Sequence, residues 1–317
     1  MSAGRMILVH AHPDDESITT GGTIARYAAA GEEVTIVTAT LGEEGEVIGE
    51  RWAGLVADRA DQLGGYRIHE LDLAVAALGA DAASGPRHEF LGGAGRWRDS
   101  GMAGSAAAAH PRAFAAAPLA DVVDSLVEVI RRLRPHVLVT YDPYGGYGHP
   151  DHQRVHRAST DAVVAAADAR HRPDLGRTWS VPKVYWTVTG AGQLERGIAA
   201  LTDGSIPLCD GWRLPEPGEL PSVPDRSVTT AIDVGPWCGA KAAAMAAHAT
   251  QITVAPHGRG YVLSNLIAQP LFDTEMFLRV DSATGLPIDP RSVTSDTDGR
   301  LETDLFAGIV AAAGGIE

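Results

Sequence analysis

Two short segments contain histidine and aspartate at a density that a simple turn would not require. They are "HAHPDDES", residues 10–17, and "YDPYGGYGHPDH", residues 141–152, and each contains His-Pro-Asp. His12 and Asp15 are three positions apart on an expected tight turn, so both side chains could reach one ion. With His152 as the third ligand, two histidines and one carboxylate make a catalytic zinc site that keeps a position for water. The same ligand set also suits non-haem iron.

Side chains next to these candidate ligands could transfer protons. Asp14 cannot easily bind the same ion as its neighbour Asp15 but could face a water molecule, so we interpret it as the general base. Tyr147 and His149 lie in the glycine-rich stretch "GGYGH". They could donate hydrogen bonds to the oxyanion that forms when water attacks an amide carbonyl. A zinc ion would polarise the carbonyl and activate the water. These residues together predict hydrolysis of an amide.

Each cluster follows a short apolar segment that predicts a buried strand. "MILVHA" (6–11) precedes the first cluster, and "HVLVTYD" (136–142) overlaps the start of the second. In an open α/β sheet, ligands bind beyond the carboxyl ends of the strands, where the strand order reverses. We therefore expect both clusters to share one crevice.

The first half of the chain alternates strand-like and helix-like segments, which predicts a mostly parallel sheet with helices on both faces. Pro135 and the pair Gly64-Gly65 are interpreted as ends of predicted helices. The other expected strands are 33–40, 182–190 and 227–234, and the expected helices are 17–30, 50–64, 118–135, 151–168 and 236–251. The segments expected to be loops are 78–89, 101–117, 166–182 and 213–226.

The fold class predicted from this order is α/β, with a Rossmann-like, mostly parallel sheet flanked by helices and a less regular C-terminal part. We expect one domain over residues 1–317. Within it, a Rossmann-like catalytic core would span 1–165, and residues 166–317 would complete the substrate pocket.

The first cluster also has a purely structural interpretation. Asp14, Asp15 and Ser17 could all cap the helix that follows them. Capping does not require His12, however, and it does not explain the second His-Pro-Asp. His10 alternates with His12 along the strand, so we expect it on the opposite face, in the core or beside the ligands.

Other conspicuous residues have simpler interpretations. The isolated His69 and His248 are interpreted as structural or solvated, and Cys209 and Cys238, which lack cysteine or histidine partners nearby, as packing residues. The stretches "GGYG" and "GGAG" do not fit the dinucleotide fingerprint G-x-G-x-x-G after the first strand, and no P-loop lysine accompanies them.

Composition excludes some classes of partner. The 317 residues carry a formal net charge of -14, which disfavours binding to nucleic acid or to an anionic membrane surface. A neutral or cationic small substrate fits better. Two cysteines are too few for a disulfide framework and suit the cytoplasm. The first apolar segment is too short for a signal peptide, and we expect no membrane span because no apolar stretch of about 18 residues occurs.

The motifs "AHPDDE" and "GHPDH", taken together, resemble those of the LmbE-like (PIG-L type) N-acetylglucosaminyl deacetylase family. The segments 41–55, 61–68 and 91–104 are similar to the branch of that family that acts in mycothiol biosynthesis in actinobacteria. "AAHATQ" (246–251) and "ETDLFAG" (302–308) extend the resemblance over nearly the whole chain. It implies a zinc deacetylase with the LmbE-like fold that removes acetate from N-acetylglucosamine joined to inositol.

The resemblance also implies roles for single residues. It matches the assignments already made: metal ligands His12, Asp15 and His152, base Asp14, and oxyanion donors Tyr147 and His149. It adds substrate contacts at Arg67 and Asp99, and it places Glu46 and Met102 on loops that border the pocket. The stretch 79–89 is longer than the family connection we expect and should enlarge a surface loop. Residues 192–226 match weakly, so their contacts at the rim stay open.

Two rival functions differ in testable ways. A mycothiol S-conjugate amidase of the same family would share the motifs, but "LGEEGEVIG" and "GRWRDSGM" favour the deacetylase. A non-catalytic sugar-binding protein would not need Asp14, Tyr147 and His149 together. The sequence leaves zinc and Fe²⁺ both open as the metal, and it indicates no oligomeric state.

Overall fold

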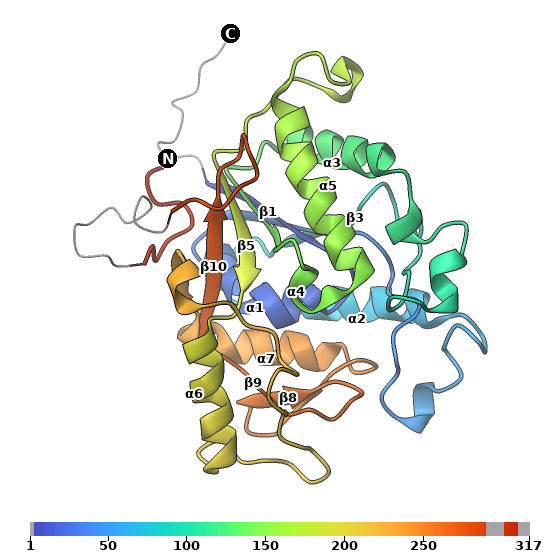
Figure 1. The fold of residues 1–317 in the computed structure, drawn as a ribbon, viewed down its shortest axis with the longest axis vertical. Helices are drawn as coiled ribbons and strands as arrows, with labels where there is room; N and C mark the ends of the chain where they lie inside the picture. The colour runs from blue at the N-terminus through green and yellow to red at the C-terminus, as the bar shows by residue number, and fades with distance from the viewer. Residues whose placement is uncertain (1–2, 290–300, 310–317) are drawn as a thin grey trace.

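A seven-stranded sheet forms the centre of the molecule, with the strand order β3-β2-β1-β4-β5-β10-β6 (Figure 1). The computed structural model describes residues 3–289 and 301–309. The strands of this sheet are β1 Arg5–His10, β2 Glu33–Thr38, β3 Arg87–Phe90, β4 Val137–Tyr141, β5 Lys183–Val188, β6 Thr230–Asp233 and β10 Thr274–Val280. The pairs among β1 to β5 are parallel, whereas β10 is antiparallel to both β5 and β6. The expected mostly parallel sheet is confirmed.

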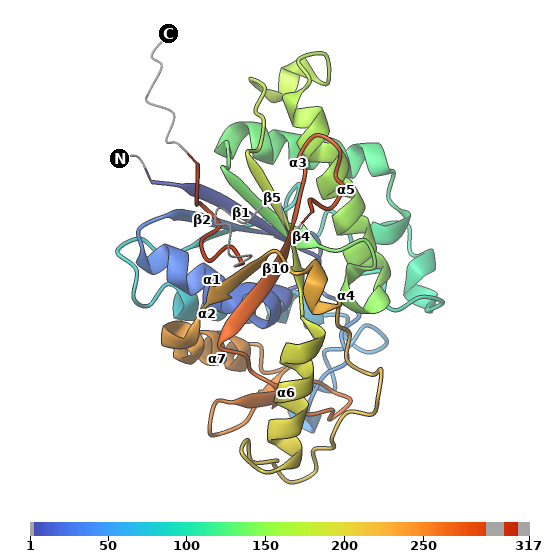
Figure 2. The ribbon, with the colours of Figure 1, turned by 60° about the vertical axis from the view of Figure 1, so that its left-hand side comes forward.

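Helices cover both faces of this sheet (Figure 2). The helices are α1 Asp15–Ala29, α2 Leu63–Leu78, α3 Leu119–Leu133, α4 Gly145–Gly148, α5 Pro150–Ala167, α6 Ala191–Thr202 and α7 Cys238–Ala247. Alternate residues of β1 enter two separate cores, as the two-residue period of a strand requires. Ile7 and Val9 pack with α3 and α5, whereas Met6 and Leu8 pack with α1, α2 and α7. The sheet is therefore buried on both sides.

The strand order reverses between β1 and β4. From β1 the chain builds β2 and β3 on one side, and it then returns to place β4 on the other side of β1. The register pairs Met6 with Val137 and Leu8 with Val139, so the carboxyl ends of the two strands lie next to each other. A crevice at this switch point is where α/β sheets bind ligands.

The helix expected at 118–135 is confirmed as α3, and its apolar stripe is buried, including Val122, Leu126 and Ile130. Arg134, the residue that ends α3, has a left-handed backbone with φ 50°. It precedes Pro135, whose ring disfavours the α conformation in the residue before it. The proline thus stops the helix where expected.

The helix expected at 50–64 is wrong. Only a 3₁₀ turn, Glu50–Trp52, occurs there, and α2 begins at Leu63 and runs through the two glycines. A Cβ on Gly64 would lie 2.7 Å from Cγ of Glu43 and 2.9 Å from Cβ of Leu41. This glycine allows close packing at the start of a helix, although we interpreted it as a helix end. The loop expected at 78–89 is also too long, because β3 begins at residue 87.

The second half holds elements that the sequence did not predict. They are α6, the strand β10, and a three-stranded antiparallel sheet of β7 Thr253–Val254, β8 Gly260–Val262 and β9 Gln269–Pro270. Because β5, β6 and β10 all join the large sheet, residues beyond 166 continue its core.

Further short 3₁₀ turns occur along the whole chain, at Ala106–Ala109, Phe114–Ala116, Pro173–Leu175, Asp225–Ser227 and Gly235–Trp237.

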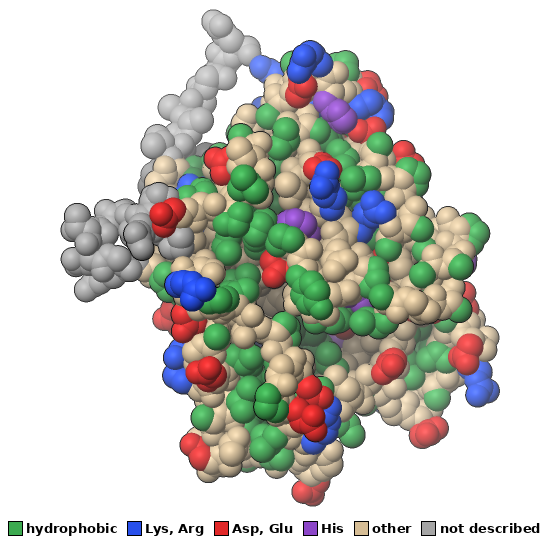
Figure 3. Space-filling model, viewed as in Figure 1, with side chains coloured by type: hydrophobic (Ala, Val, Ile, Leu, Met, Phe, Trp, Pro, Cys, Tyr) green, Lys and Arg blue, Asp and Glu red, His purple; other side chains and the backbone are tan. Residues whose placement is uncertain are grey.

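The surface carries no sign of a basic binding face in the view of Figure 3, where acidic and basic side chains are scattered among polar and apolar ones. Within residues 3–289 and 301–309, no helix is long and apolar enough to cross a membrane.

Close packing of α1 predicts a large effect of one added methyl group. Gly22 is buried, and a Cβ there would lie 2.5 Å from Cβ of Val234, whose side chain is fully buried. Gly22→Ala should lower the free energy of unfolding by about 1–3 kcal/mol, because the overpacked core must shift. Gly65→Ala is the matched control: it is also a helical glycine, but a Cβ there meets nothing within 4 Å. It should raise stability by about 0.5–1 kcal/mol. Urea unfolding of both variants checks this, and equal midpoints would contradict it.

Candidate active site

The two predicted clusters meet at the carboxyl ends of β1 and β4. His12 lies in the turn after β1, Asp15 begins α1, and His152 is in the first turn of α5. His12 and His152 are 140 residues apart in the chain, yet their ring nitrogens Nδ1 and Nε2 lie 3.3 Å apart. The predicted meeting of the two clusters is confirmed.

Three donor atoms have the spacing of a tetrahedral metal site. Asp15 Oδ2 lies 3.5 Å from His12 Nδ1 and 3.4 Å from His152 Nε2, and the two nitrogens are 3.3 Å apart. Ligands at about 2.0–2.1 Å from a tetrahedral zinc ion are about 3.3–3.4 Å from one another. All three side chains are buried. The residues therefore fit a divalent metal ion.

The other nitrogen of His12 faces two carboxylates. His12 Nε2 lies 3.3 Å from Asp151 Oδ2 and 3.4 Å from Asp99 Oδ1. A carboxylate on the far nitrogen of a histidine orients the ring and leaves the near nitrogen for a metal. Asp151 Oδ2 is held in turn by the backbone N–H of Ser100 at 2.9 Å. These donors also make two further groups that could hold an ion, His12 with His149 and His152, and His12 with Asp99 and Asp151.

The two neighbouring aspartates have opposite electrostatic environments. Burial alone would raise the pKa of Asp15, but the interactions with His152 and His12 outweigh it and hold that pKa well below its usual range. Burial raises the pKa of Asp14 to about 7, although the positive charges of Arg67 and His248 oppose the rise. Asp15 also accepts the backbone N–H of His12 at 2.9 Å. Asp15 is thus the carboxylate that stays ionised, as a metal ligand must be.

Arg67 is buried on α2 and holds Asp14. Its Nη2 lies 3.1 Å from Asp14 Oδ2, and the guanidinium also donates to the carbonyl oxygens of Gly42, at 2.7 Å, and Pro13. The sugar contact expected for Arg67 stays a prediction, and its contact with Asp14 was missed because α2 was misplaced in the sequence.

His149 has a defined hydrogen-bonding role. It caps the N-terminus of α5, where its Nδ1 accepts the backbone N–H of Asp151 at 3.2 Å. Burial lowers its pKa to about 4, so the ring is neutral at pH 7 and carries its proton on Nε2. Its ring centroid lies 4.6 Å from that of His12. The ring can therefore offer one N–H donor beside the candidate ligands.

Tyr147 lies on the turn α4, whose Gly146 has a left-handed backbone with φ 73°. The Tyr147 ring centroid is 5.0 Å from that of His152, and half of the side chain is exposed. A phenol at the mouth of the site, next to the buried histidines, can reach an incoming molecule.

The remaining predicted residues divide into two groups. Asp99 is buried beside His12, and its Oδ1 accepts the backbone N–H of Gly101 at 2.8 Å. Glu46 is exposed and accepts a hydrogen bond from Ser264 Oγ at 2.7 Å, and Met102 is 53% exposed. Glu46 and Met102 are thus surface residues, and their place at the pocket border stays a prediction. His10, as expected, lies in the core, where its Nε2 is 3.1 Å from Thr20 Oγ1.

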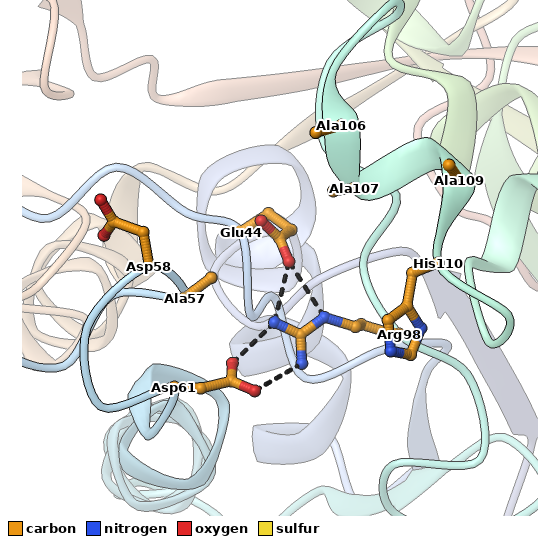
Figure 4. Close-up of a pocket in the computed structure, with 9 residues that line it drawn as sticks. All are labelled: Glu44, Ala57, Asp58, Asp61, Arg98, Ala106, Ala107, Ala109 and His110. Carbon is orange, nitrogen blue, oxygen red and sulfur yellow. Dashed lines mark hydrogen bonds and ion pairs between the residues drawn. The ribbon is translucent and has the colours of Figure 1, made fainter.

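A surface pocket of about 480 Å³ is lined by Arg98 together with residues that include Glu44, Asp61 and His110 (Figure 4). Arg98 crosses it, with Nε donating to Glu44 Oε1 at 2.9 Å and Nη2 to Asp61 Oδ1 at 2.6 Å. The backbone N–H of Glu44 also donates to Asp99 Oδ2 at 3.2 Å. This arginine therefore ties the loop that precedes α2 to the segment that holds Asp99 beside His12. The sequence motif gave no signal of this connection.

Comparison with known proteins places this geometry in context. The family model PIG-L, described as GlcNAc-PI de-N-acetylase, matches residues 7–163. The chain is 60% identical over 309 residues, 98% of its length, to the 1D-myo-inositol 2-acetamido-2-deoxy-alpha-D-glucopyranoside deacetylase of Rhodococcus jostii, of which 99% is covered. It is 52% identical to the protein of the same name from Mycobacteroides abscessus, over 98% of this chain and 99% of that one.

Solved structures share the fold at much lower identity. The N,N'-diacetylchitobiose deacetylase from Pyrococcus horikoshii is 18% identical, with a TM-score of 0.52 over 78% of this chain and 70% of that one. A 4-carboxy-2-hydroxymuconate hydratase from Pseudomonas putida KT2440 is 20% identical, with a TM-score of 0.53 over 89% of this chain and 97% of that one. Because one of these proteins is a deacetylase and the other a hydratase, the fold alone does not determine the reaction.

The spacing of the three donor atoms predicts the effect of removing one. His152→Ala should weaken metal binding by at least about 100-fold, because losing only a partner behind a ligand costs about 10–100-fold. His69→Ala, at an exposed position of α2, is the control and should leave the metal content unchanged. Elemental analysis of the purified proteins and titration of metal-free protein with Zn²⁺ measure the effect. Full metal occupancy in His152→Ala would exclude His152 as a ligand.

Proposed function

This chain belongs to the PIG-L family, and we propose that it hydrolyses the acetamide of 1-D-myo-inositol 2-acetamido-2-deoxy-α-D-glucopyranoside. The products are glucosaminyl-inositol and acetate. Identity of 52–60% over nearly the whole length to several deacetylases that carry the name of this substrate supports the choice of sugar. The reaction belongs to mycothiol biosynthesis, and the chain acts as a metal-dependent amidohydrolase.

The observation that carries the proposal is the set of donor atoms on His12, Asp15 and His152, at 3.3–3.5 Å from one another, with Asp14 directly preceding Asp15. We propose that these three residues hold one divalent metal ion. When bound, such an ion polarises an amide carbonyl and lowers the pKa of water. Zinc suits two nitrogens and one oxygen at tetrahedral spacing. Ferrous iron accepts the same ligands, so the metal content of purified protein decides between them.

Asp14 removes a proton from the attacking water in this scheme. The geometry in favour of Asp14 is its place next to a ligand and the contact of its carboxylate with Arg67 at 3.1 Å, which limits its motion. A general base must be held in position before its basicity matters. Asp15 has no such freedom, because its Oδ2 already faces both histidines and accepts the N–H of His12.

The oxyanion formed on attack needs hydrogen-bond donors. We assign this role to two groups in the segment between β4 and α5, the Nε2–H of His149 and the phenol of Tyr147. Their rings lie beside those of His12 and His152. The C–N bond breaks when the amine receives the proton that Asp14 took from the water, because the neutral His149 ring keeps its single proton on Nε2 as a hydrogen-bond donor. Asp99 and Asp151 act through His12, whose ring they orient.

Substrate contacts of Arg67, Asp99, Glu46 and Met102 remain part of the proposal. Neither a nucleic acid nor a membrane is needed by the reaction, since the substrate is a small, neutral pseudodisaccharide. We also propose a cytoplasmic location, because both cysteines, Cys209 and Cys238, are free thiols.

Acetate release by zinc-loaded enzyme tests the proposed reaction. The glucosaminyl-inositol precursor should be hydrolysed with a higher kcat/KM than free N-acetylglucosamine, because remote binding energy raises turnover of the full substrate. A mycothiol S-conjugate is the third substrate in the comparison. Preference for the conjugate would replace the deacetylase with the amidase, and no release from any of them would refute both.

Asp14→Asn tests the assignment of the base. It should lower kcat by about 100- to 10,000-fold, the usual contribution of a general base, and keep the bound metal. Asp58→Asn, on an exposed loop residue, is the control and should leave kcat unchanged. If Asp14→Asn keeps near wild-type turnover, Asp14 is not the base.

A further inference from the structure

One buried ion pair joins the end of α7 to the start of α1. His248 Nε2 lies 2.7 Å from Glu16 Oε1, and neither side chain is exposed to solvent. Taking two charges out of water is costly unless further hydrogen bonds satisfy them. Ser17 Oγ donates a second hydrogen bond to Glu16 Oε1, at 2.6 Å. The carbonyl oxygen of His248 accepts the N–H groups of Gln251 and Ile252, both at 2.9 Å. The Glu16 carboxylate is therefore fully paired and the backbone of His248 is fixed, whereas His248 Nδ1 has no hydrogen-bond partner among the described residues.

The second oxygen of Glu16 binds the backbone of Asp14. Glu16 Oε2 accepts the N–H of Asp14 at 2.9 Å. Asp14 has φ 114° and ψ -32°, a conformation that residues other than glycine adopt only when their surroundings impose it. On its other side, the carbonyl oxygen of Asp14 accepts the N–H groups of Ser17 and Ile18, both at 3.0 Å. Glu16 thus holds the N–H end of a strained residue, and α1 holds its carbonyl end.

The strained backbone of Asp14 decides where its carboxylate points. The side chain is then steadied from the opposite direction by Arg67 on α2, 3.1 Å from Oδ2. No side-chain cap is found on this residue, although it occupies the N-cap position of α1. A helix cap would direct the carboxylate at the N–H groups of α1. In the observed conformation the carboxylate instead faces Arg67 and makes no capping hydrogen bond to α1.

We propose that His248 and Glu16 are positioning residues that hold Asp14 in its strained conformation and so set the place of the general base. His248 acts only through Glu16, and Glu16 acts through the Asp14 N–H. This proposal rests on the proposed function, because it takes Asp14 as the base. It gives a role to "AAHATQ", the segment that contains His248 and lies more than 200 residues from the motif it supports.

A second buried ion pair on the same helix provides a matched control. Lys241 Nζ lies 2.7 Å from Glu275 Oε1, and both side chains are at least 94% buried. Glu275 also accepts the N–H groups of Gly22 and Thr23, in the middle of α1. Through Glu275, which lies on β10, this pair also connects α7 to α1, but no contact between the pair and Asp14 is found among the described residues. Losing it should weaken the fold without moving the base.

The experiment compares three variants with the wild-type enzyme for kcat and KM of acetate release, bound metal and thermal midpoint. His248→Leu removes the donor to Glu16 and should lower kcat by about 10- to 100-fold, as small misplacements of catalytic groups do. KM and metal content should stay within about twofold of wild type. His248→Gln keeps an N–H donor and should restore most of kcat. Lys241→Met should lower the thermal midpoint and leave kcat unchanged.

The effect of His248→Leu on kcat, measured in the wild-type and in the Asp14→Asn background, separates a positioning role from general destabilisation of the fold. In the Asp14→Asn background the base is absent, so His248→Leu should lower the residual kcat by less than about twofold. A merely structural role would lower activity equally in both backgrounds, or would lower metal content in parallel with kcat. Either result, or wild-type kcat in His248→Leu, would overturn the proposal. If His248→Leu does not fold, His248→Asn, polar but too short to reach Glu16, replaces it.

Acetate release by the wild-type enzyme shows whether a negative result concerns the proposed function or only the positioning role of His248 and Glu16. If wild-type enzyme releases no acetate, the proposed function fails, and the variants are then compared on whichever amide the enzyme cleaves. If wild-type enzyme is active and His248→Leu equals it, only the positioning role fails.

Discussion

The positions of the candidate metal ligands depend on the register between the parallel strands β1 and β4. These strands place His12 Nδ1 and His152 Nε2 at 3.3 Å although 140 residues separate them in the chain. Both strands are buried on both faces, and a slip of one residue would exchange the side chains that enter the two cores. The apolar contacts of Ile7 and Val9 on one face, and of Met6 and Leu8 on the other, therefore also determine the spacing of polar atoms at the strand ends.

Several carboxylates lie close together at the carboxyl ends of β1 and β4, and their mutual repulsion costs free energy. Backbone N–H donors offset that cost. Asp15 accepts the N–H of His12, Asp99 that of Gly101, and Asp151 that of Ser100. Asp15 and Glu16 also lie in the first turn of α1, where the helix dipole favours negative charge. Each carboxylate thus has a fixed direction before any ligand arrives, which is the condition for preorganised catalysis.

The parts of this structure that local sequence patterns encode could be predicted, and the parts that depend on distant partners could not. The apolar runs before His12 and before the second cluster identified β1 and β4, and helical periodicity identified α3. The glycines at 64 and 65 misled because Gly64 allows close packing against the preceding loop, and Gly65, where a Cβ would meet nothing within 4 Å, lies within the helix and not at its end. β7, β8 and β9 have two or three residues each, too few for a period to show. Likewise, the first motif revealed Asp14 and Asp15, but no pattern shows that His248 reaches Glu16 from 232 residues away.

Because β10 enters the large sheet between β5 and β6, the order of synthesis matters for the site. All three donor residues of the cluster lie within the first 152 positions, yet Lys241, His248 and Glu275, which hold α1 from behind, come from the last quarter of the chain. A ribosome-bound chain that ends before β10 already contains Lys241 and His248 but lacks Glu275, and it leaves one edge of β5 unpaired. Such an edge is a template for wrong pairing. The support that Glu275 gives to the middle of α1 therefore forms only after β10 has been synthesised.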